Sequence, residues 1–203
     1  AIHSAAASGK ARYDAGRDYS TTTNPAGAWS YRWMPSTTSL SSYDPAVAAT
    51  RLLTTNTGVG GNGLHDGWQT EAFVSHNTTD VEIINPDGGT QYDWLPRQLG
   101  MGPGSSEQFS VGRWTAPQAG RYAVSGTFFG ADTKPTTVDV HIFHNATQLS
   151  PSDKRSVTSY RGNGVSHTQE IEAAANDTVD FIVGVGGNGW NYDSSGLVAS
   201  VVE

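Results

Sequence analysis

The chain has 203 residues with a formal net charge of −7, and it contains no cysteine. This length suits one domain with a sizeable core. The absence of cysteine excludes a disulfide framework and a cysteine-based zinc site. The 12 basic residues are scattered, which argues against nucleic acid as a partner. No apolar run is long enough to span a membrane.

The composition predicts an all-β protein. Glycine accounts for 24 of 203 residues, against a usual share of about 7%, and serine and threonine are abundant. No apolar repeat is sustained at helical spacing, and residues 44–53 form only a short helix candidate. We therefore expect an antiparallel β-sandwich with little helix.

The N-terminal residues 1–16 are small, polar and aperiodic, so we expect an arm that precedes one β-sandwich domain over residues 17–203. The start at Ala1 is compatible with a mature N-terminus left by signal-peptide cleavage, which predicts an extracellular or cell-surface protein. Residues 28–33 follow as a strand with Trp29, Tyr31 and Trp33 on one face. Core packing is the favoured role for these aromatics, with a sugar-stacking platform as the alternative.

Further strands are expected along the rest of the chain. In the middle we expect a strand at 47–55, a pair at 68–75 and 80–84, and a long loop at 85–104. From there the pattern is regular, with strands at 108–115, 121–129, 136–144, 165–173, 178–185 and 197–202. Turns at this spacing indicate an antiparallel sandwich.

The hexapeptide Gly-Val-Gly-Gly-Asn-Gly occurs twice, at 58–63 and 184–189. Both copies match the G-x-G-x-x-G dinucleotide fingerprint, which needs a parallel βαβ unit with a helix opening at the last glycine. The second copy runs into the final strand instead, so we interpret the repeat as two similar loops.

That second loop, residues 184–196, is the best candidate for binding. Its glycines allow a ligand to approach the backbone, while Trp190 and Tyr192 offer flat faces. Asn191 and Asp193 supply hydrogen bonds or metal oxygens. The alternative is a plain hairpin loop whose aromatics cap the core.

Several stretches together carry a resemblance to a known family. They are residues 114–122 (WTAPQAGRY), 137–145 (TVDVHIFHN), 177–181 (DTVDF), 186–197 (GGNGWNYDSSGL) and, upstream, 19–31 (YSTTTNPAGAWSY). This set resembles a bacterial extracellular β-sandwich domain of Planctomycetes and Verrucomicrobia, found in exosortase-sorted (PEP-CTERM) surface proteins or beside carbohydrate-active modules. The resemblance implies a jelly-roll sandwich similar to carbohydrate-binding modules, and it implies no catalytic set.

No catalytic motif stands out, so we expect a protein that is not an enzyme. His141 and His144 are three residues apart on a predicted strand, which puts them on opposite faces and disfavours a shared metal. There is no H-E-x-x-H and no G-x-S-x-G.

No cofactor is certain, but structural calcium is a hypothesis. Asn188 and Asp193 are its candidate ligands, with Asp139 or Asp180 contributing from a neighbouring strand. The alternative is that Asp193 caps a turn.

Two functions remain open. The first is binding of a polysaccharide or glycan through aromatic and amide side chains, with Trp68, Trp94, Trp190, Asn191 and Tyr192 as the ligand-binding residues. The alternative is a self-assembling structural subunit of an extracellular filament, sheath or matrix. In that case the N-terminal arm would dock on a neighbouring copy and make a homo-oligomer.

Overall fold

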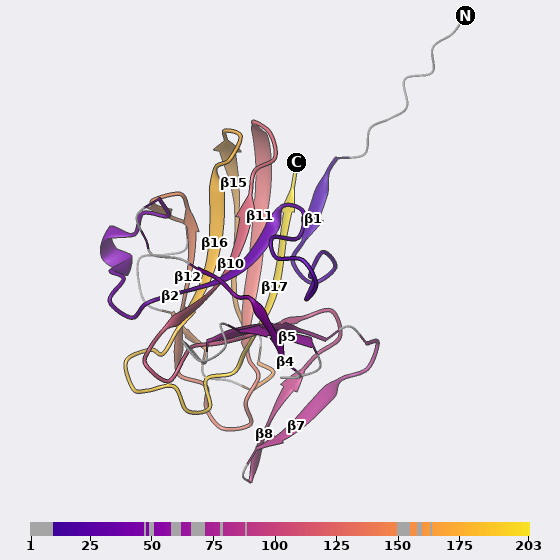
Figure 1. The fold of residues 1–203 in the computed structure, drawn as a ribbon, viewed down its shortest axis with the longest axis vertical. Helices are drawn as coiled ribbons and strands as arrows, with labels where there is room; N and C mark the ends of the chain where they lie inside the picture. The colour runs from indigo at the N-terminus through magenta and orange to yellow at the C-terminus, as the bar shows by residue number, and fades with distance from the viewer. Residues whose placement is uncertain are drawn as a thin grey trace, which may run out of the picture.

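The computed structural model describes residues 10–46, 48, 51–57, 62–65, 72–77, 79–87, 89–149, 155–157, 160–162 and 164–203. It is an antiparallel β-sandwich, as predicted (Figure 1). Its described residues contain no α-helix, and the 3-10 turn η1 (Leu40–Ser42) is the one helical element among them. None of these residues forms a helix that is long and apolar enough to cross a membrane.

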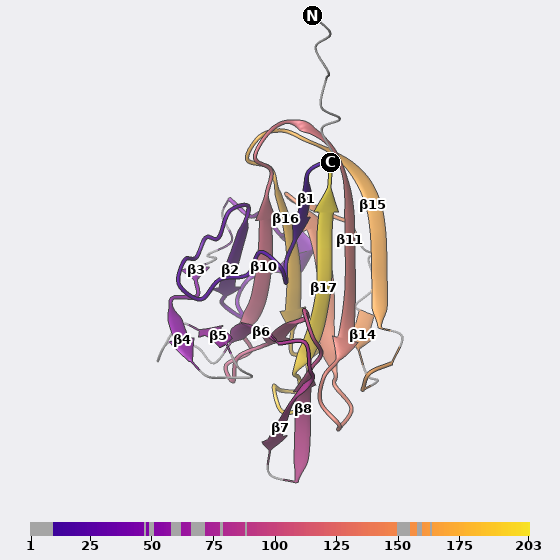
Figure 2. The ribbon, with the colours of Figure 1, turned by 90° about the vertical axis from the view of Figure 1, so that its right-hand side faces the viewer.

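Two large sheets form the sandwich, and a separate hairpin projects from one end (Figure 2). Sheet A has the strand order β15 (Val165–Ala173), β11 (Gly120–Gly130), β17 (Ser195–Val202), β9 (Leu99–Gly102), β6 (Phe73–His76), β5 (Asn62–His65) and β4 (Thr55–Thr57), with β1 (Arg12–Asp14) also paired to β17. Sheet B has the order β13 (Thr147–Gln148), β12 (Val138–His144), β16 (Thr178–Gly184), β10 (Phe109–Thr115), β2 (Trp29–Met34) and β3 (Arg51–Leu52), with β14 (Arg155–Val157) also paired to β12. The hairpin is β7 (Ile83–Asp87) with β8 (Thr90–Trp94).

The connectivity from β9 to the C-terminus is that of a jelly roll. Sheet A contains the neighbours β9, β17, β11 and β15, and sheet B contains β10, β16, β12 and then β13 with β14. The chain therefore changes sheet at nearly every connection, as two Greek keys require. Each connection between the sheets crosses one of the two ends of the sandwich, so loops gather at these ends.

The core lies between the sheets and follows the period of two along each strand. Trp29, Tyr31 and Trp33 on β2 are 0%, 0% and 5% exposed. Trp29 pairs directly with Trp114 of β10. The prediction that the β2 aromatics are core residues is confirmed, and a role as a sugar-stacking platform is wrong because their faces are covered.

Residues 35–46 and 48 contribute to an apolar cluster on the outer face of sheet B. Tyr43 from this segment packs with Met34, Val111, Phe143 and Ile182. Its hydroxyl donates to Asp180 Oδ2 at 2.5 Å, and the Arg113 guanidinium donates to the same carboxylate at 2.7 and 2.9 Å. Asp180 is thus fully buried in an ion pair, so the hypothesis that it contributes to a calcium site in the last loop is wrong.

Three expectations for the middle of the chain are corrected. Residues 85–104 are not one long loop, because they complete the hairpin and supply β9. The strand near 80–84 pairs with β8 rather than with the preceding strand, because Gly89 at φ 95° turns the chain back on itself. The strand expected at 47–55 is divided among the described residues, since β3 covers only Arg51–Leu52 and β4 begins at Thr55, and the helix candidate at 44–53 is not helical where it is described.

The described part of the N-terminal arm, residues 10–16, lies on its own domain. The arm was expected to be aperiodic, but Arg12–Asp14 form β1, which pairs with residues 200–202 of β17. Strand β9 occupies only residues 195–197 of the same β17 edge, so the rest of that edge is available to β1. Residues 1–9 lie outside the described residues.

Candidate functional site

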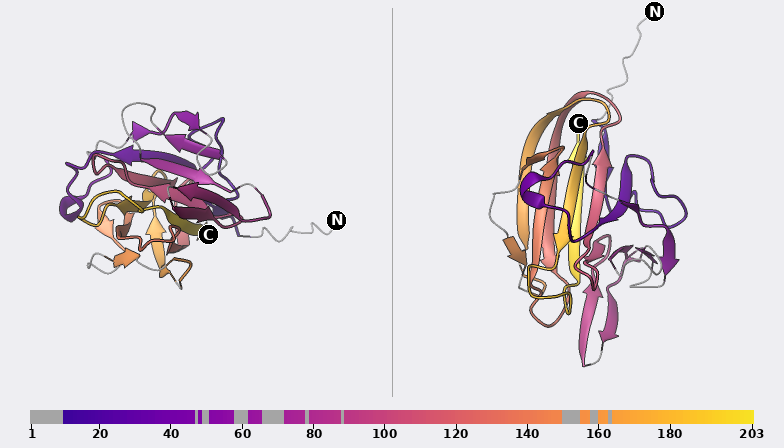
Figure 3. Two further views of the ribbon diagram at one scale, coloured as in Figure 1. Left: turned by 90° about the horizontal axis from the view of Figure 1, so that it is seen from below. Right: turned by 60° about the vertical axis from the view of Figure 1, so that its left-hand side comes forward.

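The predicted binding loop is a crossover between the two sheets and not a hairpin loop. Residues 185–194, the crossover loop, lead from β16 in sheet B to β17 in sheet A. Residues 131–137 connect β11 in sheet A to β12 in sheet B at the same end of the sandwich, which is seen from below in the left part of Figure 3. The Ala131 N–H donates to the Ser194 carbonyl at 2.9 Å, so the two connections lie side by side.

The hairpin β7–β8 is attached to this end of the sandwich. The Thr133 N–H donates to the Gln91 carbonyl, and the Thr90 and Thr133 hydroxyls lie 2.6 Å apart. Behind them the buried Asp93 carboxylate accepts from Arg161 Nη2 at 2.7 Å and from the Tyr160 hydroxyl. The crossover loop and the hairpin therefore both contact residues 131–137, and Tyr160 and Arg161 contact the hairpin at Asp93.

Thr137 ties the crossover loop to its neighbour. Its N–H and its hydroxyl both donate to Asp193 Oδ1, at 3.1 and 3.2 Å. The same hydroxyl accepts from Asn188 Nδ2 at 2.6 Å. The two residues predicted as calcium ligands are thus brought together by the structure, on either side of one threonine side chain.

The start of the crossover loop is fixed just as closely. Gly186 has φ 63°, and a Cβ at this position would lie 1.7 Å from the Thr137 carbonyl oxygen, so only glycine fits. Its N–H donates to Asp139 Oδ1 at 2.7 Å. Burial opposes ionisation of Asp139, but hydrogen bonds from His141 and from Gly186 lower its pKa overall. The carboxylate that holds the loop is therefore charged.

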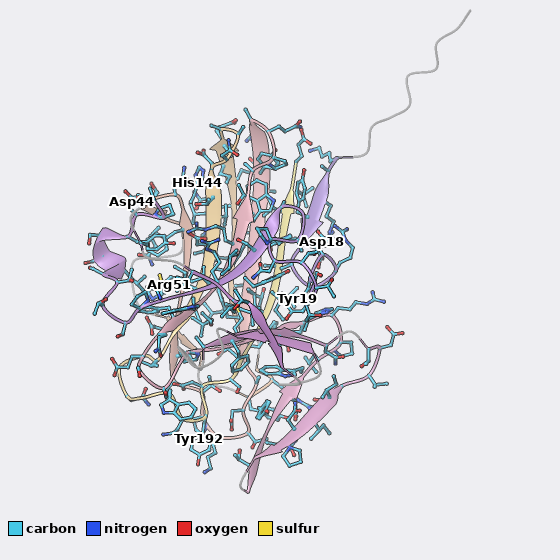
Figure 4. All side chains as sticks on the ribbon, viewed as in Figure 1. Asp18, Tyr19, Asp44, Arg51, His144 and Tyr192 are labelled. Atoms are coloured by element: carbon cyan, nitrogen blue, oxygen red, sulfur yellow. The ribbon has the colours of Figure 1, made fainter. Side chains whose placement is uncertain are left out.

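The exposed side of the crossover loop carries the predicted aromatics. Trp190 is 43% exposed and Tyr192 is 39% exposed, and Asn191 between them is also exposed. Tyr192 has φ 66°, an unusual value for a bulky residue. The Lys134 ammonium lies 3.9 Å from the centre of its ring. Figure 4 labels Tyr192 at this end of the molecule.

One of the predicted ligand-binding residues, Trp94, is not at this surface. Trp94 is 0% exposed, and its ring packs against Tyr92 and Phe73 at centroid distances of 5.5 and 6.0 Å. The prediction that Trp94 stacks on a ligand is wrong, because this residue ends β8 inside the molecule rather than at the tip of a loop. Trp68 lies outside the described residues.

Asp193 is a buried carboxyl group whose charged form is disfavoured. It is 2% exposed, and its Oδ2 has no hydrogen-bond partner. Burial raises its pKa to about 6, and the nearby Asp132 and Asp139 carboxylates act in the same direction, against the Thr137 hydrogen bonds. Its Oδ1 accepts the backbone N–H of Thr137, in the neighbouring connection between the sheets.

Within the residues that the structure describes, no group of three or more His, Asp or Glu residues could hold a metal ion. His141 contacts Asp139 at 2.8 Å and His144 contacts Asp177 at 3.4 Å. The two histidines thus have separate carboxylate partners.

The sequence pattern does not identify Thr137 and Lys134 as site residues. They lie in and just before the strand expected at 136–144, and nothing in their local pattern shows that this part of the chain faces the crossover loop. Only the strand order brings residues 134–137 beside residues 186–193.

No family model and no curated protein matches the chain. Solved structures that it is similar to include the CBM51 module of a GH95 protein from Clostridium perfringens in complex with methyl-galactose, at 12% identity and a TM-score of 0.35, covering 59% of this chain and 78% of that one. A family 35 carbohydrate-binding module from Clostridium thermocellum is 13% identical with a TM-score of 0.31, covering 64% and 91%. The CBM51-2 and INT domains of Clostridium perfringens ZmpB are 12% identical with a TM-score of 0.36, and the match covers 62% of this chain and 26% of that structure. These structural neighbours are carbohydrate-binding modules, but likenesses this distant carry no argument about what this chain binds.

Asp193→Asn is expected to change how stability depends on pH. Because the pKa of Asp193 is about 6 in the folded protein and near 4 in an unfolded chain, its protonated form contributes roughly 2–3 kcal/mol of stability below about pH 4. That contribution is lost as the pH rises through about 6. The variant should lack this loss, as measured by denaturant unfolding between pH 4 and 8 in the presence of a chelator.

Asp80→Asn is the matched control, since the Asp80 side chain is 93% exposed. Its pH profile should follow that of the parent. A parent and an Asp193→Asn variant with the same slope between pH 4 and 7 would contradict the assignment of a raised pKa to Asp193.

Proposed function

We propose that this protein is a non-catalytic β-sandwich that binds a polysaccharide or glycan at the crossover loop, with Trp190 and Tyr192 as stacking residues and Asn191 as a hydrogen-bonding residue. The observation that carries the proposal is the pair of aromatic side chains, each more than a third exposed, on a loop fixed at both ends. Exposed aromatics on a rigid frame are what a binding surface requires, because they lose little conformational entropy when a ligand binds.

The chemistry of the loop suits sugars. The apolar face of a pyranose ring packs on a flat aromatic side chain, and amide groups pair with its hydroxyls. The Lys134 ammonium lies over the Tyr192 ring. The left-handed backbone at Tyr192 is a strained conformation, and strain of this kind concentrates at binding sites.

The absence of catalysis is part of the proposal. The His141 ring is occupied by Asp139 on one side and by Gln148 on the other, at 2.8 and 3.3 Å. Both contacts lie on the outer face of sheet B and serve the packing of β12. An extracellular or cell-surface location, and an origin among PEP-CTERM-type surface proteins, belong to the same proposal and rest on the sequence resemblance.

Assembly into a filament or sheath is the second candidate function. It would require the N-terminal arm to reach a neighbouring copy. The intrachain pairing of β1 with β17 weakens it, since the described part of the arm already has a partner in its own domain.

Structural calcium is a further part of the proposal. Asp193 Oδ2 is a buried oxygen without a partner, and Asn188 uses its Nδ2 on Thr137, which leaves its Oδ1 as an acceptor. The remaining ligands would have to be backbone carbonyls or water, which calcium accepts. If calcium binds here, adding it after removal by a chelator should raise the melting temperature of the parent and leave Asp193→Asn unchanged. Equal responses in both proteins would exclude Asp193 as a ligand.

Trp190→Ala and Tyr192→Ala should each weaken binding of the best ligand from a glycan array by about tenfold or more, since losing a large aromatic contact costs about 1–3 kcal/mol. Isothermal titration calorimetry measures the change directly. Val198→Ala is the control, because Val198 is 50% exposed on β17 within sheet A, away from the loop. A glycan that binds the parent and both aromatic variants with equal affinity would refute the proposed site.

A further inference from the structure

A second concave site lies on a different part of the molecule, in the segment that contributes to the apolar cluster on the outer face of sheet B. Residues within 35–44 and Ala48 line an open cavity of about 270 Å³. This is close to the lower end of the size range of small-ligand pockets. Figure 4 labels Asp44 from its wall far from Tyr192 of the crossover loop, so the two places are separate.

Most of the polar groups that line the cavity are hydroxyls. Four hydroxyl groups and one carboxylate face the cavity, and an aromatic side chain and small apolar groups complete it. None of the described lining side chains is a lysine, arginine or histidine, so an anion would find no countercharge. The polar side chains are Thr37, Thr38, Ser39, Ser42 and Asp44.

The polar groups retain capacity for a ligand. Asp44 uses Oδ1 to accept the Ala46 N–H at 2.8 Å, and this bond fixes the turn while Oδ2 can accept another donor. A serine or threonine hydroxyl can donate one hydrogen bond and accept two. A wall of hydroxyls therefore matches a ligand that is itself made of hydroxyls.

The floor of the cavity is rigid. Tyr43 is 3% exposed, its hydroxyl donates to Asp180, and Arg113 Nη2 donates to that hydroxyl at 3.3 Å. The ring also packs on Phe143 at a centroid distance of 4.5 Å. The wall segment is thus anchored to the core of sheet B by a buried charged network, which keeps the cavity preformed.

We propose that this cavity is a second ligand site, which takes one neutral sugar ring or a polyol of that size. It does not depend on binding at the crossover loop. With both sites occupied, one molecule would hold two glycan chains, or two points of one chain, and would bind polymers with an avidity greater than either affinity.

The test is a backbone NMR titration of the whole protein with methyl β-glucopyranoside, methyl β-galactopyranoside and N-acetylglucosamine, up to about 50 mM because a single sugar ring binds with a Kd near the millimolar range. We expect saturable shifts of amide signals from residues 35–48 with at least one of these sugars. The double variant Thr38→Val/Ser42→Ala should weaken that response about three- to tenfold, as expected when hydrogen bonds to a ligand are removed. Ser36→Ala, which removes an exposed hydroxyl outside the cavity, should leave it unchanged.

The remaining signals show whether each variant is folded, and Asp44→Asn provides a second substitution should the double variant unfold. The cavity proposal is overturned if no sugar shifts residues 35–48, or if both cavity variants bind as the parent does. Signals from residues 186–194 in the same spectra report on the crossover loop. Shifts confined to that loop would therefore support the proposed function and overturn the second site, and shifts confined to residues 35–48 would do the reverse.

Discussion

The hydrogen bonds of Thr137 are the contact on which the candidate site depends. This residue begins the return into sheet B, and its N–H and hydroxyl hold Asp193 while the hydroxyl also accepts from Asn188. Its carbonyl lies against Gly186, where no side chain would fit. The ten-residue loop is thereby held at Asn188 and Asp193 by one residue of a neighbouring connection, and Asp139 holds it at Gly186. Without these bonds the exposed Trp190 and Tyr192 would sit on a flexible segment and lose entropy on binding a ligand.

The anchoring has a cost that is visible in the electrostatics. Asp193 is buried near the Asp132 and Asp139 carboxylates, and one of its oxygens has no partner. An unpaired buried polar group destabilises a fold, so a sequence selected for stability alone would gain from a neutral side chain here. The left-handed Tyr192 adds a second local cost. Two unfavourable features in one short loop are compatible with a function that requires this loop geometry.

The sequence predicted the strands well where alternation was regular, and poorly where the chain is irregular. The alternation from Gln108 onward gave most of the sandwich, and the aromatic stripe of β2 was recognised as core. The β7–β8 hairpin was missed because its strands contain Asn85, Pro86 and Asp87, which read as a loop. Trp94 was misassigned since exposure depends on which strand covers it. The role of Thr137 could not be predicted, because it arises from two connections that are distant in sequence. Only the strand order shows that they lie side by side.

The central claim is that Thr137 holds the crossover loop in place, and amide hydrogen exchange of residues 186–194 in the parent and in Thr137→Val tests it most directly. The substitution keeps the size of the side chain and the backbone N–H but removes the hydroxyl that contacts Asn188 and Asp193. The account predicts faster exchange confined to the crossover loop, with protection in β16 and β17 unchanged, because local opening is governed by the contacts that hold each segment. Exchange in the loop that is equal in the two proteins would contradict it.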